Sequence, residues 1–383
     1  MSLDTDRAAE AFAASTDWTV GLEEEFAILD PDTLDLVPRF EELRDVAAAT
    51  DPVLSESIAG ELISSEIEIR SGRGEDLHDA QARQRDRRRR LFDLAARRGV
   101  LLGSTGTHPW ADYREQPNID TEHYRRVVDG LQYVARRNNT FGIHVHVGIR
   151  GPDRAVAVCD RLRPVLPTLL ALSANSPYLD ARDAGLHSAR TQSFTKSFPR
   201  CGIPDAFGDW ATYAKYIDFL TRTQSIVEYT QVWWSVRPHF SFGTVEVRIC
   251  DAQGTAPESD ALAQLIVACI AQAARDHDEG VPHVALPGRV IEENFWRAIR
   301  YGMDGQLIDF ATMQEAPAAA AVAGLLTWTG PVRAELGVEP ALPALNGAQR
   351  QRLAIASGTP MEEVFATSVQ ETRQSYAQEV SAS

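Results

Sequence analysis

Three consecutive glutamates, Glu23, Glu24 and Glu25, stand in the middle of a stretch that otherwise has the pattern of a β-strand, residues 18–29. Side chains of a strand alternate between its two faces, so Glu23 and Glu25 share one face and Glu24 lies on the other, among apolar residues. Two carboxylates roughly 5 Å apart repel each other by about 3 kcal/mol at an effective dielectric constant of ~20. Either water screens this pair at a sheet edge, or a cation holds it together. Further ligand-type residues on similar strands would favour the cation.

Such residues recur along the chain. The predicted strands that carry them on one face are residues 61–70 with Glu66 and Glu68, residues 142–148 with His144 and His146, and residues 243–251 with Glu246 and Arg248. Glu61 has the opposite parity to Glu66 and Glu68, so it joins their face only if it precedes the regular strand or if a bulge intervenes. Apolar residues alternate with all of these positions. We therefore expect an α+β fold in which helices cover the apolar face of a sheet and leave a concave polar face as the site.

The rest of the sequence predicts elements around this sheet. We expect a strand at residues 100–104, a long active-site loop over 175–207, and helices over residues 40–49, 74–98, 121–138, 153–161, 166–174, 209–228, 257–276 and 289–300. Residues from 318 onward are alanine-rich and mostly helical. The chain shows neither an internal repeat nor a clear linker. It is therefore interpreted as a single catalytic domain, 1–383, with a core of about 18–300 and a helical C-terminal extension of about 303–383.

The charge balance excludes some classes of partner. With 38 basic and 54 acidic residues, the net charge is -16, which argues against nucleic acid or an anionic membrane as the main partner. The arginine run of the helix at 74–98 is interpreted as a solvated, salt-bridged face, with a contact between copies of the chain left open. The four cysteines form no Cys-x-x-Cys pair, and we find neither a signal peptide nor an apolar run long enough to cross a bilayer. We expect a cytoplasmic protein.

Carboxylate-rich sites suit Mg²⁺ or Mn²⁺ rather than zinc, with a histidine as an auxiliary ligand. Such ions assist phosphoryl transfer, and arginines supply further positive groups; Arg190, Arg237 and Arg248 are the candidates. Taken alone, His144 and His146 also fit one structural and one incidental histidine, and Arg190 and Arg237 also fit loop salt bridges. The sequence contains neither a Walker-type phosphate loop nor a dinucleotide-binding glycine motif.

Seven segments in this order and spacing resemble the type 2 glutamate-cysteine ligase family, the small bacterial carboxylate-amine ligases related in fold to the catalytic domain of glutamine synthetase. The similarity covers about residues 18–300. The segments are Gly21-Leu22-Glu23-Glu24-Glu25-Phe26, residues 61–68, Gly106-Thr107-His108-Pro109, residues 141–148, Ser173-Ala174-Asn175-Ser176-Pro177-Tyr178, the loop 190–207, and Phe242-Gly243-Thr244-Val245-Glu246-Val247-Arg248.

The resemblance implies an ATP-dependent ligase with a glutamine-synthetase-like fold, in which a curved, largely antiparallel sheet forms part of a barrel and helices pack on its outer face. Its reaction would be γ-phosphorylation of glutamate, or a similar acid, followed by attack of cysteine or another amine on the acyl phosphate. The cofactors would be ATP and two or three Mg²⁺ ions, with Mn²⁺ as an alternative. By the same comparison Glu23, Glu25, Glu61, Glu68, His144 or His146, and Glu246 would bind the metal ions. Arg190, Arg237 and Arg248 would bind the substrate carboxylate or the transferring phosphoryl group.

Other functions remain open at this point. A ligase of the same mechanism with a different acid or amine has the same sequence signature. A metal-dependent amide or phosphoester hydrolase could use carboxylates and histidines to activate water, although the excess of glutamate speaks against it. A non-catalytic binding module would be expected to have lost its acidic ligands, and these positions are still charged.

Overall fold

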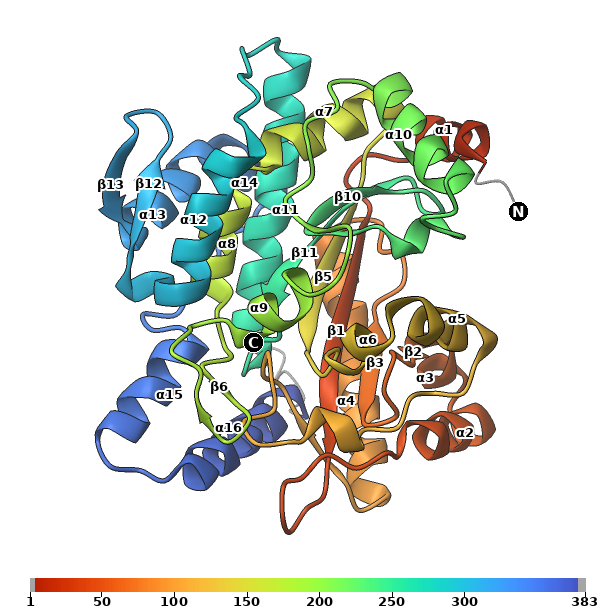
Figure 1. Ribbon diagram of the computed structural model, residues 1–383, viewed down its shortest axis with the longest axis vertical. Coiled ribbons are helices and arrows are strands. Elements are labelled where there is room, and N and C mark those ends of the chain that lie inside the picture. The colour runs from red at the N-terminus through yellow and green to blue at the C-terminus, as the bar shows by residue number, and fades with distance from the viewer. Residues whose placement is uncertain (1–3, 378–383) are drawn as a thin grey trace.

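The computed structural model describes residues 4–377; residues 1–3 and 378–383, the two ends of the expected single domain, lie outside the described residues. A seven-stranded sheet, antiparallel throughout, forms the centre of the molecule (Figure 1). Its strands run in the order β10-β11-β5-β1-β3-β2, and β4 pairs with residues 27–29 of β1, beyond the part that β5 covers. They are β1 (Val20–Leu29), β2 (Ile58–Ala59), β3 (Glu66–Arg70), β4 (Leu101–Gly103), β5 (Gly142–Gly148), β10 (Val236–His239) and β11 (Thr244–Asp251).

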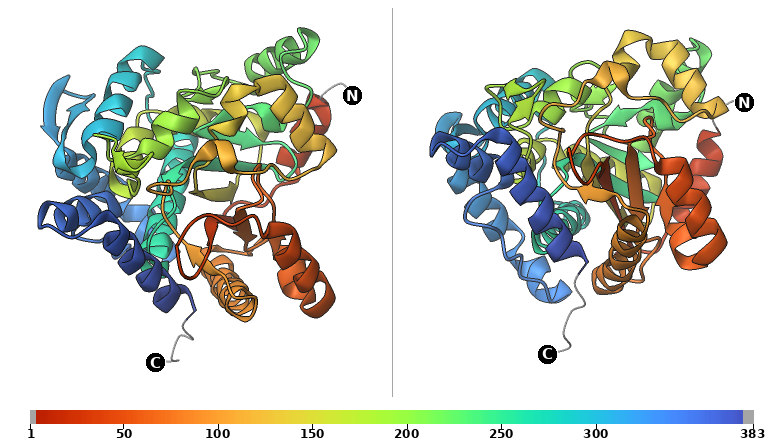
Figure 2. Two further views of the ribbon diagram at one scale, coloured as in Figure 1. Left: turned by 60° about the horizontal axis from the view of Figure 1, so that its bottom comes forward. Right: turned by 90° about the horizontal axis from the view of Figure 1, so that it is seen from below.

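Helices pack around this sheet, as Figure 2 shows from two further directions. The helices are α1 (Thr5–Ala13), α2 (Phe40–Thr50), α3 (Pro52–Ser57), α4 (Leu77–Arg97), α5 (Glu122–Leu131), α6 (Tyr133–Arg136), α7 (Pro152–Leu162), α8 (Leu166–Ser173), α9 (Ala189–Thr195), α10 (Trp210–Arg222), α11 (Ala256–Asp278), α12 (Gly288–Tyr301), α13 (Ala318–Trp328), α14 (Gly330–Leu336), α15 (Gly347–Ala356) and α16 (Met361–Tyr376). Helices α4, α7, α8 and α11 contact the sheet strands directly. The α+β fold with an antiparallel sheet and outer helices is confirmed; the sheet is open, and its partial-barrel character stays a prediction.

The apolar residues that alternate with the charged positions form the core under these helices. Leu22, Val145 and Val247 belong to one buried cluster, and Phe26 and Ile67 belong to a second. Because a strand has a period of two, burying these residues places their charged neighbours together on the opposite face. The sheet face predicted to carry the site is thus fixed by hydrophobic burial.

Several of the expected elements differ from the structure; the helix expected over 209–228, for example, ends at Arg222. The segment 175–207 is more ordered than a loop: it holds α9, a hairpin of β6 (Tyr178–Leu179) and β7 (Arg182–Asp183), and β8 (Cys201–Gly202), which pairs with β9 (Trp233–Trp234). None of these pieces is longer than the seven residues of α9, so the segment shows no long periodic pattern. The helix expected over 121–138 is split into α5 and α6 at Gln132, whose φ is 50°.

The C-terminal extension packs onto the core. A hairpin of β12 (Gln306–Asp309) and β13 (Gln314–Pro317) precedes its helices, and α16 contacts β4 and α4. The ring of Tyr376 lies 5.2 Å from that of Phe26, edge to face, and its hydroxyl donates to the carbonyl oxygen of Gln253 at 2.9 Å. The extension thereby closes the second core cluster.

The arginine run of α4 forms ion pairs, as expected for a salt-bridged face. Arg90 binds Asp51 and Asp86 at 2.9 and 2.7 Å. Arg88 departs from this picture, since it is only 1% exposed and its Nε lies 2.6 Å from Glu24. The middle glutamate of the triplet is therefore the buried partner of an arginine, on the face opposite the site.

Candidate active site

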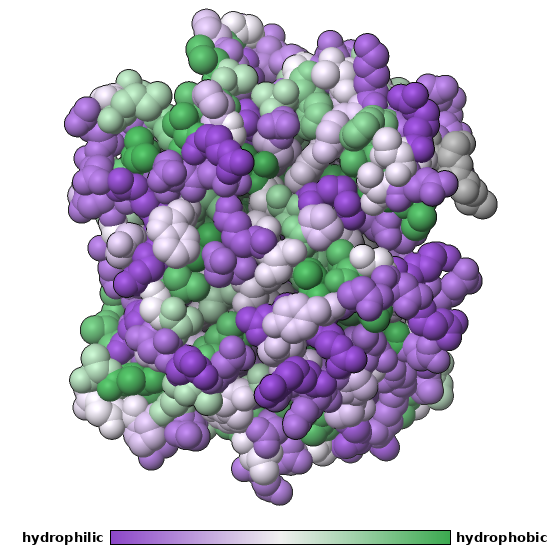
Figure 3. All heavy atoms as spheres, in the orientation of Figure 1, coloured by the Kyte–Doolittle hydropathy of each residue, from purple (hydrophilic) through white to green (hydrophobic). Residues whose placement is uncertain are grey.

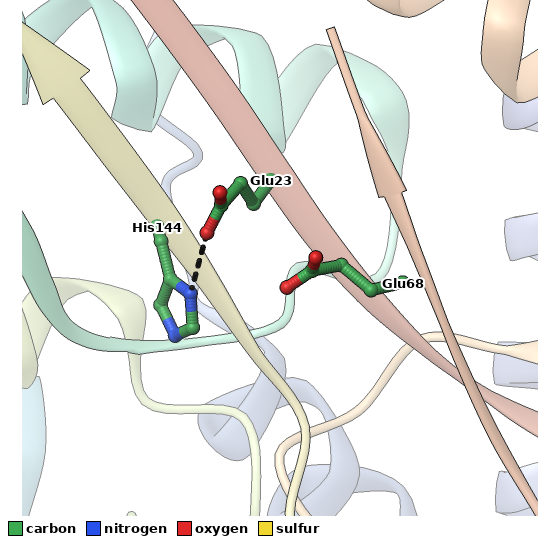
Figure 4. A group of neighbouring side chains, drawn as sticks. All are labelled: Glu23, Glu68 and His144. Atoms are coloured by element: carbon green, nitrogen blue, oxygen red, sulfur yellow. Dashed lines mark hydrogen bonds and ion pairs between the residues drawn. The ribbon is translucent and has the colours of Figure 1, made fainter. Parts of the chain in front are cut away.

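The charged residues of four strands meet on one face of the sheet. In the register of the sheet, Glu23 of β1 lies opposite His144 of β5, and Glu25 lies opposite Glu68 of β3. His146 of β5 lies opposite Glu246 of β11. Figure 4 shows Glu23, Glu68 and His144 converging from three strands, with Nδ1 of His144 3.2 Å from Oε2 of Glu23.

The seven residues predicted to bind metal form three overlapping groups in which the ligand atoms lie within 4.8 Å of one another. The groups are Glu23 with Glu68 and His144, Glu23 with His146 and Glu246, and Glu25 with Glu61 and Glu68. Glu23 and Glu68 each belong to two groups, so the three form one continuous cluster. Both histidines, which the resemblance offered as alternatives, belong to it.

Glu61 reaches this cluster because it precedes the regular strand. β3 begins only at Glu66, so the strand expected over 61–70 is shorter than predicted, and the alternation rule does not extend to Glu61. The parity conflict in the sequence is thereby resolved. Glu66 remains on the site face but belongs to none of the three groups.

Positively charged side chains already balance the carboxylates at the end of the cluster that holds Glu23 and Glu246. Burial raises the pKa of Glu246, but Arg237 and Arg248 outweigh it and hold that pKa well below its usual range. Burial acts in the same way on Glu23, and the charge of His146 together with the hydrogen bond from His144 brings the pKa of Glu23 well below the usual range. Both carboxylates are therefore ionised at neutral pH.

The other end lacks such partners. Burial, together with the neighbouring charges of Glu25 and Glu23, raises the pKa of Glu61 to about 8. Burial and the charges of Glu23, Glu61 and Glu25 raise the pKa of Glu68 well above its usual range, although Arg70 lies 3.6 Å away. Without a cation, this end therefore avoids the repulsion by keeping protons on Glu61 and Glu68 at neutral pH.

This donor set fits divalent cations. Hard ions such as Mg²⁺ and Mn²⁺ prefer carboxylate oxygens, and a cation would relieve the repulsion between Glu25, Glu61 and Glu68. Second contacts hold the donors in place: the backbone N–H of Gly142 donates to Glu25, and Nδ1 of His146 lies 3.0 Å from the Thr244 hydroxyl. The histidine then offers its unpartnered Nε2 to the cluster.

The three candidate arginines differ in what they can still bind. Arg237 donates through Nε to Glu246 at 2.6 Å and through Nη1 to the carbonyl oxygens of Val232 and Thr230 at 2.7 and 3.2 Å, so most of its donors are used in fixing Glu246. Arg248 pairs with Glu246 through Nη1, while its buried Nε has no hydrogen-bond partner in the part of the chain that the structure describes. Arg190 donates to the carbonyl oxygen of Ile249 at 3.2 Å and keeps its own Nε unpartnered.

Two cavities adjoin the cluster. Cavity 1, about 200 Å³, is lined by Glu25, Glu61, Glu66, His144, Arg190 and Arg248, and by aromatic side chains of α5, α9 and β9. Cavity 2, about 600 Å³, is lined by Glu23 and His146 and by three arginines, Arg70, Arg73 and Arg87. Since Glu23 and His144 are in contact, the cluster stands between the two cavities. On the face drawn in Figure 3, hydrophilic side chains prevail around a hollowed centre.

Some of the motif residues have structural roles. His108 is fully buried, with Nε2 2.7 Å from the carbonyl oxygen of Leu34, and burial lowers its pKa to about 4. Asp251, which sequence reasoning left without a role, accepts hydrogen bonds from the Asn175 N–H and the Ser176 and Ser188 hydroxyls at 2.8, 2.6 and 2.9 Å. These contacts anchor the start of α9, which carries Arg190.

Within residues 4–377, no helix is both long and apolar enough to span a membrane. The chain matches the model of the family described as glutamate-cysteine ligase family 2 over residues 19–368. It is 35% identical over 361 residues to "Putative glutamate--cysteine ligase 2" of Solibacter usitatus, covering 92% of this chain and 93% of the relative. It is 38% identical over 314 residues to "Putative glutamate--cysteine ligase 2-2" of Rubrobacter xylanophilus, covering 82% and 80%.

Solved structures of low sequence identity share the fold. A glutamate-cysteine ligase of Francisella tularensis, in complex with AMP, superposes with a TM-score of 0.69 at 11% identity and covers 95% of this chain and 91% of the other. A bifunctional glutathione synthetase of Pasteurella multocida gives 0.65 at 13% identity, over 97% and 54%. The family model and the full-length relatives together show that the chain belongs to glutamate-cysteine ligase family 2, as its motifs predicted.

Proposed function

We propose that the protein joins the side-chain carboxylate of glutamate, or of a similar acid, to an amine, with cysteine as the first candidate, at the expense of ATP and through an acyl phosphate. Membership of the family identifies the chain as an ATP-dependent ligase that forms amide bonds. The observation that carries the proposal is the carboxylate–imidazole cluster between two cavities. This arrangement suits the transfer of a phosphoryl group between two bound substrates, because cations held by the cluster would neutralise its charge.

Divalent cations held by Glu23, Glu25, Glu61, Glu68, His144, His146 and Glu246 would neutralise the phosphate oxygens during transfer. The chain's own groups do the remaining work. Arg248, whose Nε is free and buried beside Glu246, would hold the transferring phosphoryl group or the acyl phosphate. Arg237 keeps Glu246 ionised and oriented.

Cavity 2 is the better fit for the nucleotide. It is the larger of the two, and Arg70, Arg73 and Arg87 line it beside Glu23 and His146. Phe242 also lines it, is 58% exposed, and stacks on His239 with ring centres 4.4 Å apart. An exposed aromatic face suits a purine base, and arginines suit phosphates. The acid and the amine would then bind in cavity 1, which is the smaller of the two and is lined by Arg190 and Arg248.

The test is ADP release by the purified protein with MgATP and L-glutamate, with and without cysteine and a panel of other amino acids and amines. Product masses are read in parallel. We expect ADP to appear together with a product whose mass equals acid plus amine minus water, and the panel to identify the amine. Absence of ADP with every acid and amine would contradict the ligase proposal.

Two variants sharpen this test. Glu61→Gln removes one carboxylate from the cluster and should abolish turnover, and the matched control Glu371→Gln changes an exposed glutamate of α16 and should not. Hydrolysis of an amide or phosphoester without ATP would instead favour the metal-dependent hydrolase. Full turnover by Glu61→Gln would contradict the role of the cluster.

A further inference from the structure

Glu66 is a buried carboxylate that the metal cluster does not use. It opens β3, lies opposite Ala27 of β1, and is 1% exposed. Its Oε2 has no hydrogen-bond partner within residues 4–377, and the side chain lines cavity 1. A carboxylate buried in this way is costly unless something binds it. The residue belongs to none of the three groups of potential metal ligands, so its partner is sought elsewhere.

Arg190 supplies the opposite charge in the same cavity. Its side chain lies directly over Gly142, where a Cβ atom would come within 2.2 Å of Nη2. Glycine at the start of β5 therefore lets the guanidinium lie close against the sheet. Arg190 is 5% exposed, and its Nε finds no hydrogen-bond partner among the described residues. Asp251 and its hydrogen bonds hold α9 so that this side chain enters the cavity.

Glu66 and Arg190 line the same cavity, yet they form no ion pair among the residues that the structure describes. The described hydrogen bonds of Arg190 go to the carbonyl oxygens of Ile249 and Arg248 and leave Glu66 uncontacted. A carboxylate and a guanidinium that face one cavity and do not pair leave room for a molecule with both charges.

We propose that Glu66 and Arg190 form a clamp for a zwitterion, in which Glu66 accepts hydrogen bonds from the α-ammonium group and Arg190 donates to the α-carboxylate of an amino-acid substrate. The clamp rests on the proposed function, and it specifies that cavity 1 takes an α-amino acid rather than a simple dicarboxylic acid. The ammonium group would bring three N–H donors to the Glu66 carboxylate. The planar guanidinium of Arg190 matches the geometry of the substrate's α-carboxylate. The side-chain carboxylate of the substrate is then free to extend toward Arg248 and the cluster.

Direct binding tests the clamp separately from catalysis. Isothermal titration with MgCl₂ and a non-hydrolysable ATP analogue compares three probes: L-glutamate, glutarate, which lacks the ammonium group, and 4-aminobutyrate, which lacks the α-carboxylate. Leaving a buried charged group unpaired costs enough that we expect wild-type protein to prefer L-glutamate over either analogue by on the order of 100-fold.

Each variant should weaken the preference for L-glutamate over one of the two analogues and leave the other preference unchanged. Glu66→Gln should bring L-glutamate and glutarate within about threefold of each other, while the preference over 4-aminobutyrate remains. Arg190→Lys, which keeps the charge and loses the fork, should weaken the preference over 4-aminobutyrate and leave that over glutarate. Mn²⁺ affinity of Glu66→Gln should equal that of wild type, since Glu66 lies outside the metal groups.

Three results would overturn the clamp. One is an unchanged preference for L-glutamate over glutarate in Glu66→Gln. Another is a loss of Mn²⁺ affinity in that variant, which would make Glu66 a metal ligand. The third is the absence of binding of any of the three probes to wild type. None of these touches the ligase proposal, which stands or falls with ADP release. Thermal melts of both variants confirm that each is folded before titration.

Discussion

The same substitution should have opposite effects on stability at two glutamates of one sheet. Glu24 accepts hydrogen bonds from Nε and Nη2 of Arg88 at 2.6 and 2.9 Å and from Gln84 at 2.7 Å, all buried on the helix-covered face. Glu24→Gln leaves the guanidinium without its main counter-charge. Removing one partner of a buried ion pair costs about 3–5 kcal/mol of unfolding free energy. Because Arg88 keeps its contact with Asp260 at 2.8 Å, we expect a loss of unfolding free energy at the lower end of this range.

Glu68 lies on the opposite face, where its carboxylate is within 4.8 Å of those of Glu61 and Glu25. At that distance and an effective dielectric constant of ~20, each repulsion is worth about 3 kcal/mol, and proton uptake already relieves part of it. Glu68→Gln should therefore stabilise the metal-free protein by about 1–3 kcal/mol at pH 8. The gain should vanish at low pH, because a protonated Glu68 no longer repels its neighbours.

The assay is urea unfolding of wild type and both variants in EDTA at pH 8 and pH 5, followed by circular dichroism. The expected result is a lower midpoint for Glu24→Gln at both pH values and a higher midpoint for Glu68→Gln at pH 8 only. The stabilised variant should nevertheless lose ATP turnover. Loss of stability in both variants, or a tolerated Glu24→Gln, would refute the assignment of the two faces.

Phe242→Ala should raise the KM for ATP about tenfold and leave that of the acid unchanged, because base stacking is worth about 1–3 kcal/mol; a change in the acid KM alone would move the nucleotide out of cavity 2. Arg248→Lys should lower kcat at least about tenfold through loss of the guanidinium geometry, and an unchanged rate would remove Arg248 from the phosphoryl site. His108, with its pKa lowered to about 4 by burial, stays neutral in the folded state while the unfolded chain takes up a proton below pH 6.5. Stability should therefore fall by up to about 3 kcal/mol between pH 6.5 and 4, and His108→Asn should flatten this pH dependence of the urea midpoint; an equal slope in both proteins would refute it.

The sequence alone determined which residues share a face. Alternation in β1, β5 and β11 placed Glu23 with Glu25, His144 with His146, and Glu246 with Arg248, and the burial of the residues between them confirms each pair. This succeeds because a strand has a fixed period of two, and one buried face then defines the other. The family followed from the spacing of these same segments.

The tertiary structure decided which strands are neighbours and what the irregular segments contribute. Strand order brings Glu246 beside His146, although about a hundred residues separate them in the chain, and no local pattern encodes that contact. Glu61 reaches the cluster because its backbone leaves the regular strand, where alternation no longer applies. Helix α9 was not predicted within the segment 175–207, because its short helix and strands are too short to show a hydrophobic period.

The charge of a residue also did not predict whether its side chain is buried. Arg88 stands in a run of arginines that the sequence assigns to a solvated face, yet it is buried against Glu24 because α4 packs that turn onto β1. Glu66 has the same parity as Glu68, but only the position of α9 and Gly142 places Arg190 in the cavity that Glu66 lines. Periodicity fixes the direction of a side chain from its own strand, whereas its partners depend on which distant segments pack above it.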